Sequence, residues 1–181
     1  MFTVNIKVKN KDPKAYEKLK KRLLAMSSKK VVAGFPKGKL NNPHYEGSKG
    51  HPGASIIDVA IWNEFGTYNI PRRDFLNPAS AKWQEYFKQM VEENQEEIVT
   101  GKLKIDNFLK TMGEAGAEFI RSSIIKLDTP PNAPITIEGG WMKNKKSGKP
   151  FKVKGKKSSN PLVDTGDLSK APTYEIRRKD A

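Results

Sequence analysis

The first residues of the chain alternate between apolar and polar side chains, with apolar residues at Phe2, Val4, Ile6 and Val8. This period of two is typical of a β-strand with one buried face. A second strand is predicted at residues 30–35, and Pro36 ends it because proline cannot donate a ladder hydrogen bond. Residues 173–176 alternate in the same way. We therefore expect a small sheet with strands from both ends of the chain.

Two shorter stretches have the helical period instead. Asp12-Pro13 supplies an N-cap followed by proline at the first helical position. The apolar side of the helix that follows is expected to consist of Tyr16, Leu19, Leu23 and Leu24. A second helix is predicted at residues 54–65, where the apolar face is expected at Ile57, Ala60, Ile61 and Phe65. Gly66 follows as its C-cap.

Two longer helices are predicted at residues 75–98 and 105–127. Ile70-Pro71 forces an extended approach to the first of them, and we expect Asp74 to cap it. The second is expected to place on one side Phe108, Met112, Ala115, Phe119 and Ile120. Thr100-Gly101 interrupts the helical pattern between them, and we expect the two helices to form a hairpin. Together the elements predict an α+β fold, in which a small antiparallel or mixed sheet packs against two or three long helices.

Composition adds exposed basic segments to this picture. A chain of 181 residues fits a single domain over residues 1–181. Hydrophobic residues make up 36% of it and charged residues 30%, which predicts a modest core with long basic loops or arms. Residues 37–53 are rich in Gly and Pro and predict an exposed loop. Residues 138–160 predict a basic extended arm or a hairpin insertion.

The charge of the chain is unevenly distributed. The formal net charge is +14, and the excess of lysine and arginine lies in residues 1–53 and 129–160, on either side of a mildly acidic centre. Such asymmetry favours a polyanion or an acidic protein surface as a neighbour. Protein docking is the favoured interpretation for residues 138–160, because aromatic anchors stand among the lysines. The residues concerned are Trp141, Lys143, Lys145, Lys146, Lys149 and Phe151.

Candidate catalytic chemistry is sparse in the sequence. The pattern of a phosphate-binding loop is not met around Gly38 and Lys39, and His44 and His51 have no acidic or sulfur partner at a usable local spacing. Asp164-Thr165-Gly166 matches the aspartic protease signature, yet it occurs once and in a chain with long helical periods. A turn stabilised by its own side chains is the preferred interpretation. We expect no enzymatic activity, no cofactor and no metal.

Targeting signals are also missing from the pattern. No run of about eighteen apolar residues could span a bilayer, and the polar start has no hydrophobic signal-peptide centre. We therefore expect a soluble protein without membrane contacts. The chain contains no cysteine, which excludes disulfides and thiolate metal sites. Its stability has to come from packing or assembly.

Three blocks of the sequence resemble one protein family when taken in order: "IIDVAIWNEFGTYNIPRRDFL", "TPPNAPITI" and "NPLVDTGDLSKAPTYEI". They are similar to blocks of the tail-completion or head-to-tail joining proteins of tailed bacteriophages, also called neck or virion morphogenesis proteins. The likeness covers roughly residues 54–178. It departs from the family pattern at Asp74, where proline is frequent, and in the length of the basic insertion at residues 138–160.

The resemblance implies a structural protein of the virion neck or tail, assembled in the host cytoplasm. It implies a homo-oligomeric ring, expected to be six-fold, that contacts the tail terminator or tail tube and the head connector and meets packaged DNA without sequence specificity. The residues that it marks as an interface or structural motif are Asn63, Glu64, Phe65, Gly66, Thr67, Pro71, Arg73, Phe75, Asp164, Thr165, Gly166 and Leu168.

Two interpretations of that motif stay open. In one, Asn63, Glu64, Thr67 and Arg73 fix a tight turn between helices through hydrogen bonds and a charge pair. In the other, the turn faces an adjacent subunit or the tail. The alternative function for the whole protein is a nucleic-acid-binding accessory protein that uses the two basic segments. An aspartic hydrolase is a third and weaker interpretation.

Overall fold

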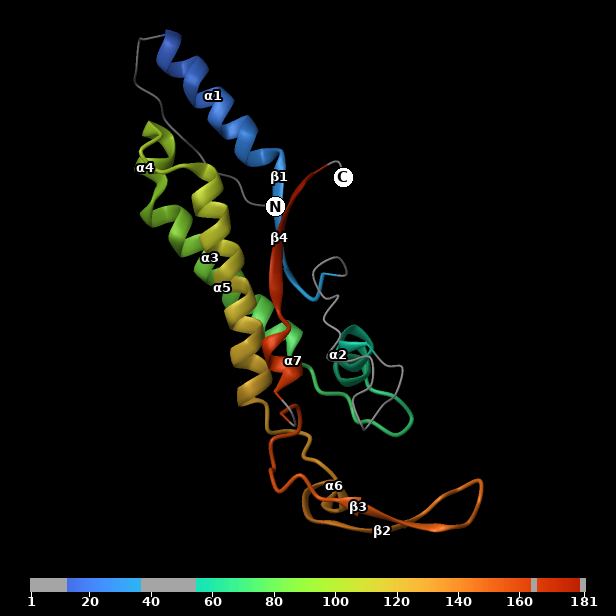
Figure 1. Cartoon of the computed structure of the whole chain (residues 1–181). Helices are drawn as coiled ribbons and strands as arrows, with labels where there is room; N and C mark the ends of the chain where they lie inside the picture. Colours follow the sequence, from blue (N-terminus) through green and yellow to red (C-terminus); the bar gives the residue numbers. More distant parts are fainter. Residues whose placement is uncertain (1–12, 37–54, 164–165, 180–181) are drawn as a thin grey trace.

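A computed structural model describes residues 13–36, 55–163 and 166–179 of the chain. Its helices are α1 (Pro13–Ser27), α2 (Ile56–Phe65), α3 (Leu76–Glu93), α4 (Gln95–Thr100), α5 (Ile105–Lys126), α6 (Pro134–Glu138) and α7 (Asp167–Lys170). Its strands are β1 (Lys29–Gly34), β2 (Gly139–Lys143), β3 (Pro150–Lys154) and β4 (Thr173–Arg178). The predicted α+β fold is confirmed, because small antiparallel two-stranded sheets accompany a long pair of helices (Figure 1).

Helices α3 and α5 pack against each other and form the long central part of the elongated body (Figure 1). The prediction of α5 is confirmed, whereas the prediction of one helix over residues 75–98 is wrong, because the helix breaks at Asn94. The Asn94 side-chain amide donates to the Met90 carbonyl at 2.9 Å. Asparagine competes in this way with the helical backbone. Helix α4 therefore begins as a separate element.

Strands β1 and β4 form an antiparallel ribbon that contacts α5. Its register runs from the pair of Lys29 with Arg178 to the pair of Gly34 with Thr173. The predicted strands at residues 30–35 and 173–176 are confirmed in this ribbon. The strand predicted at residues 2–8 and the whole of the loop predicted at residues 37–53 lie outside the described residues.

Two glycines let α5 lie close to its neighbours. A Cβ built on Gly113 would lie 2.2 Å from a ring carbon of Tyr174, and one on Gly116 would lie 2.6 Å from the ring of Trp83. Real Cβ atoms do not come this close, so a methyl group at either position would push the elements apart. The Trp83 indole N–H donates to the Met112 carbonyl at 2.8 Å and fixes α3 on α5.

The described residues form two hydrophobic core clusters. One lies around the C-terminal end of α5 and consists of Ile56, Ala60, Phe75, Ala79, Ile120, Ile124, Leu162 and Leu168. The other lies nearer α4 and is formed by Ile98, Phe108, Leu109 and Met112. Of the five residues expected on the apolar side of α5, Phe108, Met112 and Ile120 are buried, while Ala115 and Phe119 are half-buried. The first cluster ties α2, α3, α5 and α7 together.

The expected apolar side of α1 is only partly buried. Leu19 is buried, but Tyr16 and Leu24 are each more than half exposed and Leu23 is also exposed. The helix lies at one end of the body, where an Arg22 guanidinium donates to the Val99 carbonyl at 2.6 Å. Of the four residues expected on this side, Leu19 packs inside the protein, and the other three remain exposed.

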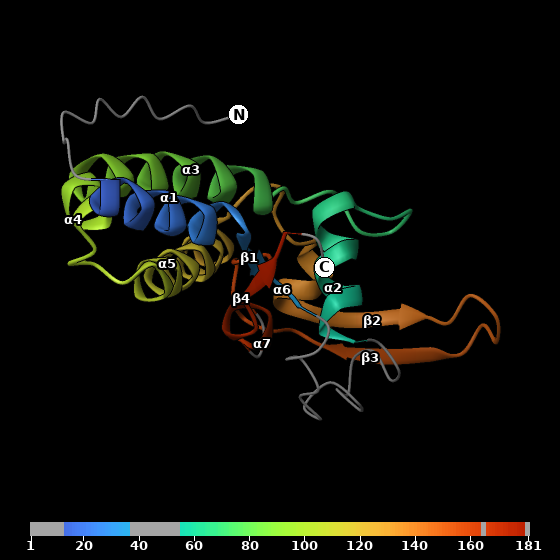
Figure 2. The same ribbon diagram turned by 90° about the horizontal axis from the view of Figure 1, so that it is seen from above.

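The segment at residues 138–160 contains a β-hairpin of β2 and β3. Trp141 pairs with Lys152 and Met142 pairs with Phe151. Asn144 builds the tip, since its side-chain oxygen accepts hydrogen bonds from the backbone N–H groups of Lys146 and Ser147. The hairpin extends sideways from the body (Figure 2). Of the two forms predicted for this segment, the hairpin is the one observed.

Candidate functional site

The turn between α2 and α3 contains most of the predicted motif. Gly66 has φ 77° and ends α2 as predicted. A Cβ there would lie 3.0 Å from the backbone nitrogen of Arg72, so both the conformation and the space require glycine. The Thr67 hydroxyl accepts from the backbone N–H of Ile70 at 3.1 Å, and Pro71 is exposed beyond it. The turn is therefore fixed by its own local bonds.

Glu64 is a buried carboxylate with a structural task. Its Oε2 accepts hydrogen bonds from the backbone N–H groups of Phe75 and Leu76, each at 3.0 Å. These groups begin α3, where a negative charge is favourable. Burial raises the pKa of Glu64, and the two hydrogen bonds oppose that rise. Phe75, whose N–H is held in this way, is fully buried in the core.

Asp74 was predicted to cap α3, but it contributes less to the cap than Glu64 does. It accepts from the backbone N–H of Asn77 at 3.2 Å and from the Asn77 side chain at 2.9 Å. These bonds to Asn77 are the main reason that the pKa of Asp74 is lowered. The principal cap of α3 therefore comes from Glu64 on the preceding helix. Glu64 is too far from α3 in the sequence to be part of a local capping pattern.

Arg73 is the other buried charged residue of the turn. Its backbone N–H donates to the Asn63 carbonyl at 2.7 Å, and its Nη1 donates to the Asn63 side-chain oxygen at 3.1 Å. Its remaining donors reach Pro130 O at 3.1 Å, Pro131 O at 3.4 Å and Asn132 Oδ1 at 3.2 Å. Burial lowers the pKa of Arg73, but a guanidinium stays charged at neutral pH.

The expected charge pair of this turn is formed by different residues. Glu64 and Arg73 direct their charged groups to backbone and amide partners, whereas the ion pair in the turn joins Arg72 and Asp74 at 3.3 Å on the surface. An exposed pair of this kind contributes little to stability. The hydrogen bonds of the turn were predicted correctly, and its buried charges act through them.

The hydrogen bonds of Arg73 continue into a third part of the chain. The Asn132 side-chain amide donates to the Asn160 carbonyl at 3.3 Å, and the Asn160 amide donates to the Ile125 carbonyl at 2.6 Å. The Asn160 side-chain oxygen accepts from the backbone N–H groups of Leu162 and Val163, both at 3.1 Å. We call the set Asn63, Arg73, Asn132 and Asn160 the Arg73 junction. It links residues 56–76, 129–137 and 160–176, which are far apart in the sequence.

The buried face of α2 differs from the predicted one. Ile56, Ala60 and Glu64 are buried, whereas Ile61 is 47% exposed and Phe65 is 70% exposed. The helix is apolar around most of its circumference, so periodicity alone could not choose the face. The bonds from Glu64 to the start of α3 set the rotation of α2. Phe65 consequently points outward.

The last predicted motif residues surround α7. Asp164 and Thr165 lie outside the described residues. Gly166 has φ 81° immediately before α7, and its carbonyl accepts from the Ser169 hydroxyl at 2.8 Å. Leu168 is buried in the cluster around Ile124. The described part of this motif is thus a turn and a hydrophobic anchor.

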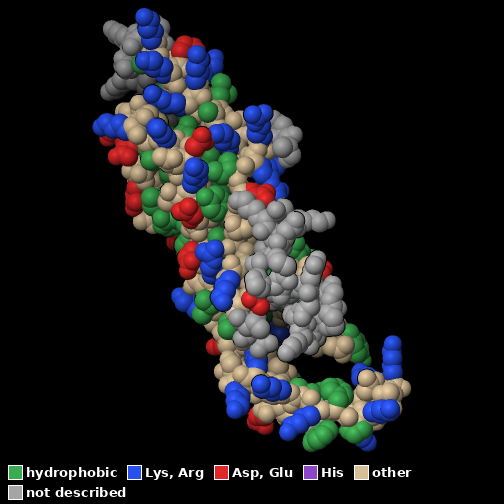
Figure 3. All heavy atoms as spheres, in the orientation of Figure 1, with side chains coloured by type: hydrophobic (Ala, Val, Ile, Leu, Met, Phe, Trp, Pro, Cys, Tyr) green, Lys and Arg blue, Asp and Glu red, His purple; other side chains and the backbone are tan. Residues whose placement is uncertain are grey.

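The predicted docking arm carries its marked residues on the surface. Trp141 is 71% exposed, and Phe151 is nearly half exposed. Four lysines are also exposed on the hairpin or at its tip: Lys143, Lys145, Lys146 and Lys149. Basic and hydrophobic side chains gather together there (Figure 3). Within the described residues, none of these four lysines forms an ion pair.

Asn132 and Asn160 were missed by reasoning from the sequence. Both stand beside prolines, in "PPNAP" and "SNPL", and asparagine beside proline usually signals only a turn. Their connection with Arg73 depends on contacts between residues 59 and 28 positions apart. No local feature of the sequence marked them as partners of Arg73.

The described ranges contain no group of three or more histidine or acidic side chains arranged to hold a metal ion. None of their helices combines the length and apolar character that crossing a membrane requires. A groove of about 790 Å³ lies beside β1 and α3, with Met26, Val31, Trp83 and Phe87 among its lining residues.

Comparisons with protein-family models, with curated proteins and with solved structures give no match to this chain. Its function therefore has to be inferred from its own residues.

Proposed function

We propose that the protein is a structural subunit of a tailed bacteriophage virion, which completes the tail and joins it to the DNA-filled head as part of an oligomeric ring. The observation that supports this most is the Arg73 junction. Three blocks that resemble neck proteins are far apart in the sequence, and Arg73, Asn132 and Asn160 connect them by hydrogen bonds. Blocks that build one junction are expected to recur together in one fold.

The chemistry of the junction suits a structural role. The Arg73 guanidinium is buried and its donors are occupied by carbonyl and amide oxygens. Glu64 is likewise occupied by two backbone N–H groups. Groups held in this way stabilise a turn and have little freedom to act on a substrate. We therefore propose a non-enzymatic function without a cofactor.

The surface suits a subunit that becomes covered in an assembly. Large apolar side chains are exposed on α2 and on the hairpin, among them Phe65 and Trp141. Contiguous exposed apolar residues usually mark protein interaction sites. In a neck, such surfaces would meet sister subunits, the tail terminator or tail tube, and the head connector.

The experiment is electron microscopy of phage particles assembled without this protein. We expect filled heads and complete tails that remain separate, and joined virions after the wild-type chain is supplied in trans. The Arg72→Ala chain serves as a control that should also restore joining, since Arg72 lies outside the buried junction. Tails that fail to form, or virions that join without the protein, would contradict the proposal.

A second candidate function is nucleic-acid binding, and the observation that favours it is the charge of the hairpin. Residues 139–157 contain eight lysines and no acidic residue. Binding through phosphate neutralisation would weaken steeply with salt. A monomeric protein that binds duplex DNA with a steep salt dependence, and whose loss leaves head-to-tail joining intact, would favour this function over the first.

A further inference from the structure

Strand β1 has one edge that pairs with no strand of the described residues. Lys179 N donates to the Ser28 carbonyl at 2.8 Å, in the same register as the pairs of β1 with β4. Bonded and non-bonded pairs alternate along an antiparallel ladder. The backbone N–H and C=O groups of Lys29, Val31 and Ala33 therefore point away from β4. Among the described residues, no loop or side chain forms a hydrogen bond with the backbone of Val31 or Ala33.

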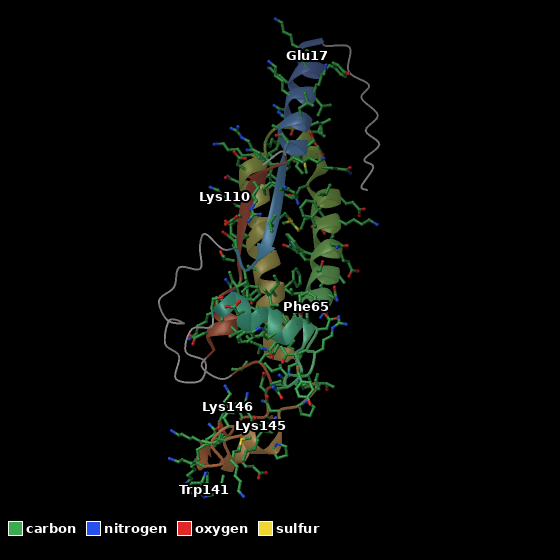
Figure 4. All side chains as sticks on the ribbon, turned by 90° about the vertical axis from the view of Figure 1, so that its right-hand side faces the viewer. Glu17, Phe65, Lys110, Trp141, Lys145 and Lys146 are labelled. Carbon is green, nitrogen blue, oxygen red and sulfur yellow. The ribbon has the colours of Figure 1, made fainter. Side chains whose placement is uncertain are left out.

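The open edge of β1 faces the groove of about 790 Å³. Figure 4 shows β1 in blue between β4 in red and α3 in green, so the groove lies on the side of β1 away from β4. Apolar side chains from α1, β1, α3 and α5 line it: Met26, Val31, Trp83, Phe87 and Leu109. Leu109 is buried, whereas the other four are half-buried. The groove thus has an apolar floor that the described residues leave incompletely covered.

The two faces of β1 differ in character. A Cβ on Gly116 of α5 would lie 2.8 Å from the Ala33 side chain, so Ala33 faces α5. Val31 lies on the same face and packs against the cluster that contains Leu109. Lys30 therefore lies on the outer face. A strand added at the open edge needs apolar residues on the α5 side and polar residues on the outer side.

The chain contains a segment with this pattern before α1. Apolar residues occupy the even positions from Phe2 to Val8, and polar residues occupy the odd positions between them. This alternation is typical of a strand with one buried face. Residues 1–12 lie outside the described part of the chain. The length of the segment and the direction of α1 indicate where it can lie.

The segment is long enough to reach the groove. Helix α1 begins at Pro13 and ends at Ser27 beside β1, a distance of about 21 Å at 1.5 Å per residue. An extended chain from Phe2 to Pro13 spans up to about 36 Å. It can therefore run back along α1 and continue past its end by about four residues. Because β1 continues in the direction of α1 (Figure 1), the segment would lie antiparallel to β1.

We propose that the open edge of β1 and the groove form an acceptor site for a third strand, and that its occupant is the segment 2–6 of the same chain. The even residues of the segment cover the apolar floor, and its backbone bonds to Val31 and Ala33. An open edge strand is a template for pairing with other chains. The occupant closes this edge within the subunit, so β1 is not available for pairing between copies.

Charge does not oppose the added strand. The reach of the segment allows two registers, which differ by two residues and keep the apolar residues inward. Lys30 on the outer face lies opposite Thr3 in one register and opposite Asn5 in the other. Both are uncharged, so like charges do not lie directly opposite one another. On the inner face, Lys29 forms an ion pair with Asp106 of α5.

The first test compares the two faces of the segment in the full chain. The inner-face variant carries Val4→Asp and Ile6→Asp, which place carboxylates on the apolar floor. The matched control carries Thr3→Asp and Asn5→Asp, which place the same charge in the same segment on the outer face. The measurement is the exchange rate of individual backbone amides by NMR.

The amides of Val31 and Ala33 report occupation of the open edge. We expect them to be protected in the wild type and the control, and to exchange at least about tenfold faster in the inner-face variant. The amides of Lys30 and Val32 bond to β4 and should change little, which verifies that the ribbon is intact. Fast exchange of Val31 and Ala33 in the wild type, or equal loss of protection in the two variants, would overturn the proposal.

A second test leaves the apolar residues of the segment unchanged. The chain contains no cysteine, so introduced pairs are the only thiols. Thr3→Cys is combined with Lys30→Cys or with Val32→Cys, the positions opposite Thr3 in the two registers. Non-bonded pairs of an antiparallel ladder have Cα atoms about 4.5 Å apart, which suits a disulfide. The control combines Thr3→Cys with Arg177→Cys on β4, beyond the opposite edge of β1.

We expect one of the two β1 pairs to form a disulfide within the monomer under mild oxidation, and the control pair to remain reduced. Peptide mass spectrometry identifies the bond, and dilution does not reduce its yield when it forms within one chain. Cross-linking of the control in preference to both β1 pairs, or no disulfide in either β1 pair, would overturn the proposal. Disulfide-linked dimers from a mixture of the single variants Thr3→Cys and Val32→Cys, without a cross-link inside the double variant, would assign the site to a second copy and also overturn it.

Discussion

Arg73 donates a hydrogen bond to the side-chain oxygen of Asn132, a residue 59 positions later, at 3.2 Å. The same guanidinium reaches two neighbouring carbonyls and the side chain of Asn63. One planar cation thereby holds the α2–α3 turn against the segment that leads into the hairpin. Lysine has no such fork of donors and cannot make these bonds together.

Replacing Arg73 should be costly for stability. The Arg73→Ala variant is expected to lose about 2–4 kcal/mol of unfolding free energy, because several buried acceptors lose a charged donor. Arg73→Lys should recover only part of that loss. Arg72→Ala is the matched control and should change stability by less than about 1 kcal/mol, since its ion pair is exposed. Urea denaturation measures all three, and equal losses at the two positions would refute the assigned role.

Glu64 should make stability depend on pH. Its folded pKa is raised by burial, so the folded state holds the proton more tightly than the unfolded chain. The corresponding stability is fully present below the unfolded pKa of about 4.3 and is lost as pH rises through the folded pKa. Relative to wild type, Glu64→Gln should therefore become more stable as pH rises from about 4 to 7.

The control for this prediction separates charge from hydrogen bonding. Glu64→Ala leaves the N–H groups of Phe75 and Leu76 without their acceptor and should cost about 2–4 kcal/mol. A hydrogen bond with Glu64 contributes to the lowered pKa of Asp74, so Glu64→Gln is compared with its parent in an Asp74→Asn background as well. Denaturation curves at several pH values provide the measurement. Parallel pH profiles for wild type and Glu64→Gln would contradict the prediction.

Gly116 should not tolerate a methyl group. A Cβ there would lie 2.6 Å from the Trp83 ring and 2.8 Å from the Ala33 side chain. The overpacking of Gly116→Ala is expected to cost about 1–3 kcal/mol, against a gain of about 1 kcal/mol in helix propensity. We expect a net loss, with Lys110→Ala on the exposed side of α5 as a neutral control. A stabilised Gly116→Ala protein in thermal unfolding would show that the elements can separate freely.

The hairpin lysines should matter for joining rather than for DNA retention. The variant with serine at Lys143, Lys145, Lys146 and Lys149 is expected to leave heads and tails separate. The charge-matched control replaces four exposed lysines elsewhere with serine: Lys18, Lys20, Lys21 and Lys110. It should join normally, because these side chains lie on α1 and α5, outside the hairpin. Counting joined virions and measuring protected DNA test this, and normal joining with leaking DNA would reverse the assignment.

The elements that could be predicted from the sequence are those whose hydrophobic pattern allows a single buried face. Helix α5 has a single apolar side and ends where expected. Helix α2 is apolar nearly all round, so its buried face depended on Glu64 and its bonds to α3. The break at Asn94 depended on a side-chain hydrogen bond that periodicity does not report.

The Arg73 junction could be predicted only in part. Asn63 and Arg73 stood in one recognisable block, and their mutual bonds follow from a short turn. Asn132 and Asn160 come into contact only because the folded chain passes through α5 and α6 in the observed arrangement. Long-range contacts of this kind have no local sequence signature. The expectation that the three blocks belong together did not specify which of their atoms are in contact.

The pairing of β1 with β4 also determines when the protein can finish folding. Lys29 lies opposite Arg178 in the ribbon, so one strand leaves the ribosome long before the other. Closing so long a loop is entropically costly and slow. Leu162 and Leu168 of the main cluster are made late as well. A chain in which β4 has not yet paired with β1 therefore keeps part of its core exposed.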